Sequence, residues 1–194
     1  MRSWARRIGL CAIVVAFFAP SLSPLTFSAA PDETDHLEVR PDPAGGVRAT
    51  ARISFPAKPE IIQAILTDYA RWPELFEVRM RLANLQIKDG VATTDLRIDH
   101  ALLPGERRLV SESRALPSGG LITDLIGGDF KRYHRVWKLM AVGGGAQTRA
   151  DFELVTEIDS MVPDWLVALA MRRELEAHFR IVKEKALVRA RSEK

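Results

Sequence analysis

Alternating apolar and polar positions recur along most of the chain after residue 46. From Val47 to Phe55 every second side chain is apolar and those between are polar. A period of two over this length is typical of a half-buried strand. Further strand-like segments, separated by Gly, Pro or Asp-Gly turns, are predicted at residues 78–87, 91–103, 107–116, 121–126, 130–142 and 147–158. Their short connections indicate an antiparallel meander.

Helical spacing replaces this alternation in two regions. After Pro59, apolar residues at 61, 62, 65 and 66 predict a short helix, and Asp68 can cap a second one that reaches Phe76. From Pro163 to about residue 191, apolar residues recur at steps of three and four opposite a charged face. At about 1.5 Å per residue, this last helix is long enough to cross a whole sheet.

The element order predicts an α+β fold: one strand, two short helices, about six strands and one long amphipathic helix. The economical arrangement is a single curved antiparallel sheet whose apolar face is covered by the C-terminal helix. Residues 31–46 contain three prolines, two glycines and several acids, and we expect them to form an exposed lead-in with a turn. The folded domain is therefore expected at residues 47–192.

The first 30 residues have the three parts of a secretory signal peptide. A basic head ends at Arg7, an apolar stretch covers residues 8–19, and the segment ends in Ser28-Ala29-Ala30. This predicts a periplasmic or secreted protein, with an uncleaved membrane anchor as the minor alternative because Pro20 and Pro24 interrupt the apolar run. Cys11 is the only cysteine, so cleavage leaves a chain without disulfides, as suits a bacterial periplasm.

The net positive charge of the chain lies in these first 30 residues. The net charge is +3 and the pI is near 9.2. Arg2, Arg6 and Arg7 account for the whole excess, so residues 31–194 are neutral, and nucleic-acid binding through bulk charge is not expected. The basic C-terminal end can touch anionic lipid, but acidic residues lie beside it, and a solvated helix end is favoured over membrane contact.

Catalytic and metal-binding motifs are missing from the sequence. The four histidines lack zincin spacing, and the Gly-rich turns lack the order of a phosphate-binding loop. No serine lies in a G-x-S-x-G elbow. We therefore expect no metal, no cofactor and no catalytic constellation.

Two polar residues nevertheless fall on apolar faces. His100 has the parity of Leu96 and Ile98, and Arg135 has that of Tyr133 and Trp137. A hydrogen-bonded core histidine is the favoured interpretation of the first. A buried charge needs a carboxylate partner or a ligand anion, and an arginine paired with an acid at the sheet rim is favoured for the second. Both remain weak catalytic candidates.

Two motifs carry a family resemblance. Leu66-Thr67-Asp68-Tyr69 followed by Trp72-Pro73 resembles the opening of START-like helix-grip (SRPBCC) proteins, in particular the polyketide cyclase/dehydrase and coenzyme Q-binding branch. Gly128-Asp129-Phe130 and Trp137-Lys138-Leu139, followed by a Gly-rich hairpin, a strand and a long helix, are also similar to this family. The likeness covers residues 47–190 and is more specific for fold than for activity.

The resemblance implies a hydrophobic cavity between the curved sheet and the C-terminal helix. By analogy with the family, its lining comprises Tyr69, Trp72, Phe76, Leu96, Ile98, Tyr133, Trp137, Leu139, Phe152, Leu154, Met171, Leu175 and Phe179. Each of these residues can equally belong to a solid core.

Three functions follow as hypotheses. The first is non-catalytic binding of a lipid or other hydrophobic small molecule by an exported protein. The second is a cyclase or dehydratase that uses His100 or Arg135 inside the cavity. The third is a protein-interaction module. No oligomeric state is predicted.

Overall fold

The structure is a computed structural model that describes residues 35–103 and 105–192. The expected signal peptide, residues 1–30, lies outside the described residues. The elements are β1 (His36–Pro41), β2 (Val47–Phe55), α1 (Pro59–Leu66), η1 (Tyr69–Leu75), β3 (Arg79–Lys88), β4 (Val91–Asp99), β5 (Arg107–Ala115), β6 (Gly120–Gly128), β7 (Phe130–Val142), η2 (Gly143–Gly145), β8 (Gln147–Ile158) and α2 (Asp164–Ser192).

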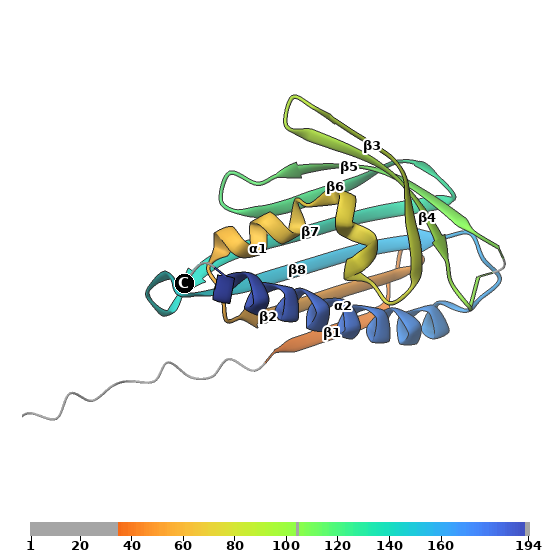
Figure 1. The fold of residues 1–194 in the computed structure, drawn as a ribbon. Coiled ribbons are helices and arrows are strands. Elements are labelled where there is room, and N and C mark those ends of the chain that lie inside the picture. The colour runs from red at the N-terminus through yellow and green to blue at the C-terminus, as the bar shows by residue number, and fades with distance from the viewer. Residues whose placement is uncertain (1–34, 104, 193–194) are drawn as a thin grey trace, which may run out of the picture. The chain divides into compact units, whose positions relative to one another are not determined.

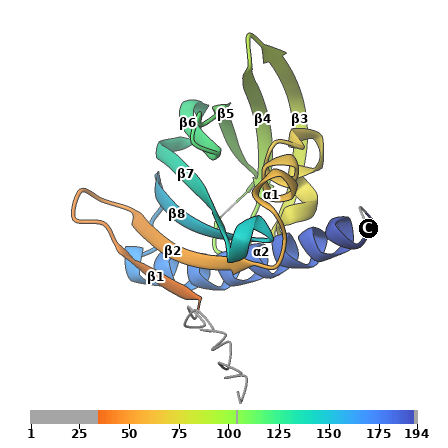
Figure 2. The same ribbon diagram turned by 90° about the vertical axis from the view of Figure 1, so that its left-hand side faces the viewer.

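The strands form one antiparallel sheet in the order β1-β2-β8-β7-β6-β5-β4-β3. Strands β3 to β8 are a meander, and the β1–β2 hairpin joins its last strand (Figure 1). Figure 2 shows the sheet curving around the helices, with α1 and α2 on its concave side. The predicted α+β helix-grip architecture is confirmed.

Strand β1 differs from the expected lead-in. His36–Pro41 pairs with β2 at the edge of the sheet, with His36 opposite Arg52 and Pro41 opposite Val47. Leu37 and Val39 pack against the core, and β1 runs beside α2 (Figure 1). Two alternating apolar side chains stabilise this strand only because α2 covers them. The proline at its end is tolerated because β1 is an edge strand.

The core fills the concave side of the sheet. Trp137 of β7 is fully buried and meets Phe152 and Phe179 edge-on, at ring-centroid distances of 4.8 and 5.6 Å. Ile62 of α1 and Val182 of α2 are also fully buried. Each such side chain contributes about 1.5–3 kcal/mol by leaving water. This packing fixes α1 and α2 against the sheet.

Helix α2 follows the amphipathic pattern seen in the sequence. Its 29 residues bury one stripe, which consists of Ala168, Leu175, Ala177, His178, Phe179, Val182 and Ala186. Within the described ranges, no helix is both long and apolar enough to cross a membrane.

One contact fixes the start of β6 relative to β7. Gly120 has φ +109°, and a Cβ placed there would lie 2.0 Å from the carbonyl oxygen of Trp137. Its N–H donates a 2.7 Å hydrogen bond to Oε1 of Gln63 in α1. Only glycine permits this approach, which holds β7 and its inward side chains in register.

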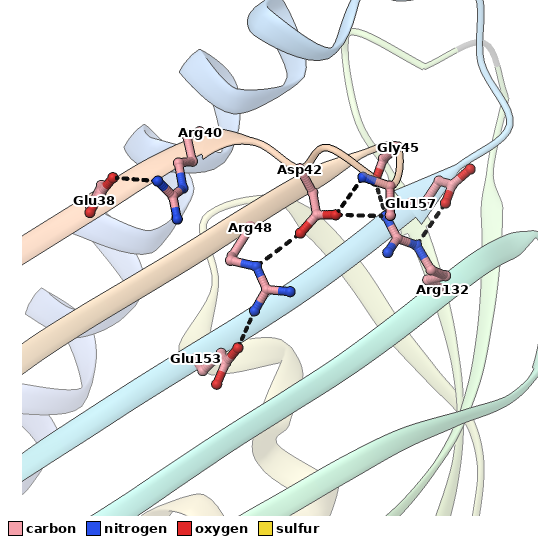
Figure 3. A network of polar contacts seen from close by, with 9 residues as sticks. Glu38, Arg40, Asp42, Gly45, Arg48, Arg132, Glu153 and Glu157 are labelled. Atoms are coloured by element: carbon pink, nitrogen blue, oxygen red, sulfur yellow. Dashed lines mark hydrogen bonds and ion pairs between the residues drawn. The ribbon is translucent and has the colours of Figure 1, made fainter.

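The outer face of the sheet carries a charged network (Figure 3). Asp42, in the β1–β2 turn, accepts a 2.9 Å hydrogen bond from Nε of Arg48 and lies 3.5 Å from Arg132 of β7. Arg48 also pairs with Glu153, and Arg132 pairs with Glu157 at 2.7 Å. The backbone N–H of Ala44 and the Arg48 guanidinium hold the pKa of Asp42 below its usual value. These contacts tie the turn to β7 and β8.

Candidate functional site

A cavity of about 170 Å³ lies between the concave face of the sheet and α2. Strands β3, β4, β5, β7 and β8 supply one side of its wall, α2 supplies the other, and Trp72 of η1 (Tyr69–Leu75) also lines it. Most wall residues are apolar, among them Leu96, Leu109, Phe152 and Leu154.

The structure brings most of the candidate lining residues to this cavity. Nine of the thirteen lie in its wall: Trp72, Phe76, Leu96, Ile98, Tyr133, Phe152, Leu154, Met171 and Leu175. Tyr69, Trp137, Leu139 and Phe179 instead pack in the core. Trp137 is surrounded by the aromatic rings of Phe55, Phe152 and Phe179, which separate it from the open space.

Arg135 differs from the rim arginine expected from the sequence. Its side chain is buried in the cavity wall, with 6% of the residue exposed. The guanidinium carbon lies 4.5 Å from the centroid of the Trp72 ring, and one N–H donates to Oγ1 of Thr123 at 3.4 Å. Its Nε has no hydrogen-bond partner, and no carboxylate among the described residues pairs with it. Its position in the middle of the sheet, opposite Thr123 of β6, explains the missing acid.

Hydroxyl groups continue from Arg135 across the sheet. Thr123 accepts from Arg135, and its hydroxyl also shares a 2.9 Å hydrogen bond with that of Ser113 on β5. Thr94 and Ser111 form a second buried hydroxyl pair at 3.1 Å between β4 and β5. All four hydroxyl residues are fully buried. The pairs satisfy polar groups that would otherwise be costly inside the sheet.

Beside Arg135, α2 contributes a neutral histidine. His178 is 2% exposed, and its Nδ1–H donates to the carbonyl of Leu75 at 2.8 Å. Its ring stacks on Phe76 with centroids 4.3 Å apart, while Nε2 has no hydrogen-bond partner among the described residues. Burial is the main cause that lowers the pKa of His178 to about 3; the Leu75 hydrogen bond opposes this decrease, and the charge of Arg135 contributes to it. Nε2 is therefore an acceptor at neutral pH.

Tyr69 packs next to this group without entering the cavity wall. Its ring meets that of Trp72 edge-on at 5.0 Å. Burial raises the pKa of the Tyr69 hydroxyl, and the nearby charge of Arg135 opposes the rise. The phenol is thus protonated at neutral pH.

His100 lies in the cavity wall, in the turn after β4. Its Nδ1 accepts the backbone N–H of Leu102 at 3.1 Å, so the proton of the neutral ring is on Nε2. That Nε2 lies 3.9 Å from Oε1 of Glu174 on α2. His100 and Arg135 thus share one cavity, but no contact between the two side chains is found within residues 35–103 and 105–192.

The first turns of α2 contribute to the cavity wall. Asp164, Val167 and Ala170 line the cavity, while Met161, Trp165 and Leu169 are apolar side chains exposed to solvent nearby in the chain. The N–H of Gly46 donates to Asp164 at 3.2 Å, which joins the β1–β2 turn to this end of the helix.

His178 and Glu174 are wall residues that the sequence analysis did not single out. The pattern does contain the information for His178, because it follows Leu175 by three residues and precedes Val182 by four. It thus occupies the apolar stripe of α2. Glu174 has the same spacing, three residues after Met171 and four before His178, but a charged side chain is more often found on the solvated face of a helix.

Possible metal ligands do not form a cluster in the part of the chain that the structure describes. No group of three or more His, Cys, Asp or Glu residues that could hold a metal ion occurs there. The cavity instead offers one guanidinium, one neutral imidazole and apolar walls. These groups can hold an apolar molecule with a single polar end.

Comparison with known proteins gives the fold. No protein-family model matches the sequence, and no curated protein does either. A START superfamily protein from Mycobacterium smegmatis matches in structure with a TM-score of 0.57 and 17% identity, over 72% of this chain and 96% of that one.

Two further solved structures have the same fold. A STAR-related lipid transfer protein from Xanthomonas axonopodis matches with a TM-score of 0.59 and 12% identity, over 80% of this chain and 95% of that one. The Zhui aromatase/cyclase from Streptomyces sp. R1128 matches with a TM-score of 0.52 and 10% identity, over 80% and 94%. The chain therefore has the START-like (SRPBCC) helix-grip fold, which is found in lipid-transfer and aromatase/cyclase proteins alike.

Proposed function

We propose that this protein binds a hydrophobic small molecule or lipid between its sheet and α2, without chemical conversion. The observation that carries the proposal is the cavity itself, which is bounded by apolar side chains from five strands and α2. Natural interiors are close-packed, so a space of this size inside a core indicates a binding site. The START-like fold of lipid-transfer proteins supports the same assignment.

A cavity-filling substitution tests this function. Met171 lies in the cavity wall on α2, so Met171→Trp should occupy the ligand space and weaken binding of the neutral fluorophore N-phenyl-1-naphthylamine at least tenfold. Leu169→Trp introduces the same side chain at an exposed position of the same helix and should leave binding unchanged. Equal binding by both variants would exclude this cavity as the site.

A second candidate function is a cyclase or dehydratase. The feature that favours it is the unpartnered Nε2 of His178 near Arg135. A general base works best with a pKa near the operating pH, whereas burial lowers that of His178 to about 3. Non-catalytic binding is therefore the better supported function.

We also propose that the protein is exported. The three-part pattern of residues 1–30 supports this localisation. Expression of the full chain in a bacterium, followed by fractionation and N-terminal sequencing, should recover a periplasmic protein that begins near residue 29 or 31. Recovery of the full-length chain in the membrane fraction would favour the uncleaved anchor.

A further inference from the structure

The position of Arg135 defines a distinct end of the cavity. Arg135, Asp164 and Glu174 are the wall residues with a permanently charged or acidic side chain among those described. Of these, Arg135 alone is buried. Glu174 keeps 29% of its side chain exposed and lies 3.9 Å from His100. The two acidic wall residues are thus accessible to solvent, whereas the one Arg is buried.

The hydrogen-bonding capacity of this cation is largely unused. A guanidinium has five N–H donors, and Thr123 is the one acceptor found for it among the described residues, at 3.4 Å. Trp72 covers one face of the guanidinium and leaves its N–H edges to other acceptors. A buried charge without a counter-charge is costly. A ligand that supplies the missing acceptor therefore gains binding free energy at this point.

A carboxylate is the acceptor that best fits the unused N–H donors of Arg135. Its planar pair of oxygens matches the guanidinium fork and forms a charge-assisted hydrogen bond. A dianionic group such as a phosphate monoester would bring a second negative charge, and no second Lys or Arg lines the cavity among the described residues. One cation in apolar surroundings favours one negative charge.

The volume limits the apolar part of the ligand. The cavity measures about 170 Å³, slightly more than the roughly 150 Å³ that accommodates benzene in an engineered apolar cavity. A short acyl chain or one substituted ring fits such a space, and a two-chain lipid does not.

We propose that the cavity binds a small amphiphilic carboxylate, with its carboxylate on Arg135 and its hydrocarbon part against the apolar wall. This inference rests on the proposed binding function and adds the chemical class of the ligand. It also sets the orientation, because the charged end of the ligand lies at the buried Arg135 and the hydrocarbon extends along the apolar wall.

Isothermal titration of the purified protein at pH 8 with three chain-matched probes tests the inference. Octanoate should bind at least tenfold more tightly than 1-octanol or methyl octanoate, which share its chain but carry no charge. Arg135→Met should weaken octanoate binding at least tenfold and change 1-octanol binding less than threefold. Lys138→Met, which removes a cation from the exposed face of the same strand, should alter neither affinity.

The outcomes distinguish the proposed carboxylate ligand from the more general proposal that the cavity binds a hydrophobic molecule. Equal binding of all three probes, or an octanoate preference that survives Arg135→Met, would overturn the inference and leave hydrophobic binding intact. If the protein binds none of the three probes and does not bind N-phenyl-1-naphthylamine, both the proposed ligand class and the proposed binding function are wrong. A readout without any variant is ¹³C NMR of octanoate labelled at C1: contact with Arg135 lowers the pKa of the bound acid below that of the free acid, and a raised pKa would contradict it.

Discussion

Acidification should destabilise the protein through His178. The imidazole is 2% exposed, donates from Nδ1 to Leu75 and stacks on Phe76 at 4.3 Å. Burial lowers its pKa to about 3 in the folded protein, whereas a histidine in the unfolded chain titrates near 6.5. Between these two pH values the unfolded state binds one more proton than the folded state, so stability falls as the pH falls.

The expected magnitude follows from this difference. Each pH unit inside the window costs about 1.4 kcal/mol of unfolding free energy. The contribution of His178 is complete above pH 6.5, and about 2 kcal/mol of it is lost at pH 5. The carboxylates with lowered pKa values, those of Asp42, Glu74 and Asp95, lose their contributions at lower pH.

Urea unfolding at pH 7.5, 6 and 5 measures the effect in the wild-type protein and in His178→Asn. The asparagine amide can keep a donor toward Leu75 but does not titrate. Between pH 7.5 and pH 5, the wild type should lose about 2 kcal/mol more than the variant. Parallel pH profiles would refute the reasoning, since they would mean that the folded protein protonates this imidazole as readily as the unfolded chain does.

Two further substitutions test the buried charge on β7 and the close contact of β6 with β7. Arg135→Met should raise the melting temperature of the ligand-free protein by about 5 °C in calorimetry. The substitution removes an unpaired buried charge, whose cost exceeds the roughly 2 kcal/mol that the guanidinium gains by stacking on Trp72. A lower melting temperature would show that the guanidinium stabilises the fold. Gly120→Ala should cost at least about 2 kcal/mol in urea unfolding, since the new Cβ meets the Trp137 carbonyl at 2.0 Å. Gly90→Ala, also at positive φ but in open space, should cost about 1 kcal/mol, and equal losses would deny a role to the close contact.

The alternation of apolar and polar residues gave its most detailed prediction for β7. A period of two was enough to place Arg135 on the buried face with Trp137, and the structure shows both residues buried. Its lack of a carboxylate partner could not be predicted, because the neighbouring groups come from other strands. Which residue faces Arg135 depends on the β6–β7 register, which puts Thr123 opposite it.

Other features escaped prediction for different physical reasons. Strand β1 contributes two apolar side chains, Leu37 and Val39, among prolines and acids, and it becomes a strand only through β2 and α2. Whether Phe179 belongs to a cavity wall or to a solid core also depends on packing. Here the rings of Trp137 and Phe152 fill the space around it.

The strand order has a consequence for the order of folding. Strand β2 pairs with β8, so Phe55 has to meet Thr148 and Val47 has to meet Thr156, while β3 to β8 pair with their neighbours in sequence. Long loops close slowly relative to local hairpins. In a chain that crosses a membrane from its N-terminus, as the proposed export requires, the β1–β2 hairpin would therefore emerge early and keep one edge of β2 unpaired until β8 arrives. The binding cavity can form only after that final pairing and the docking of α2.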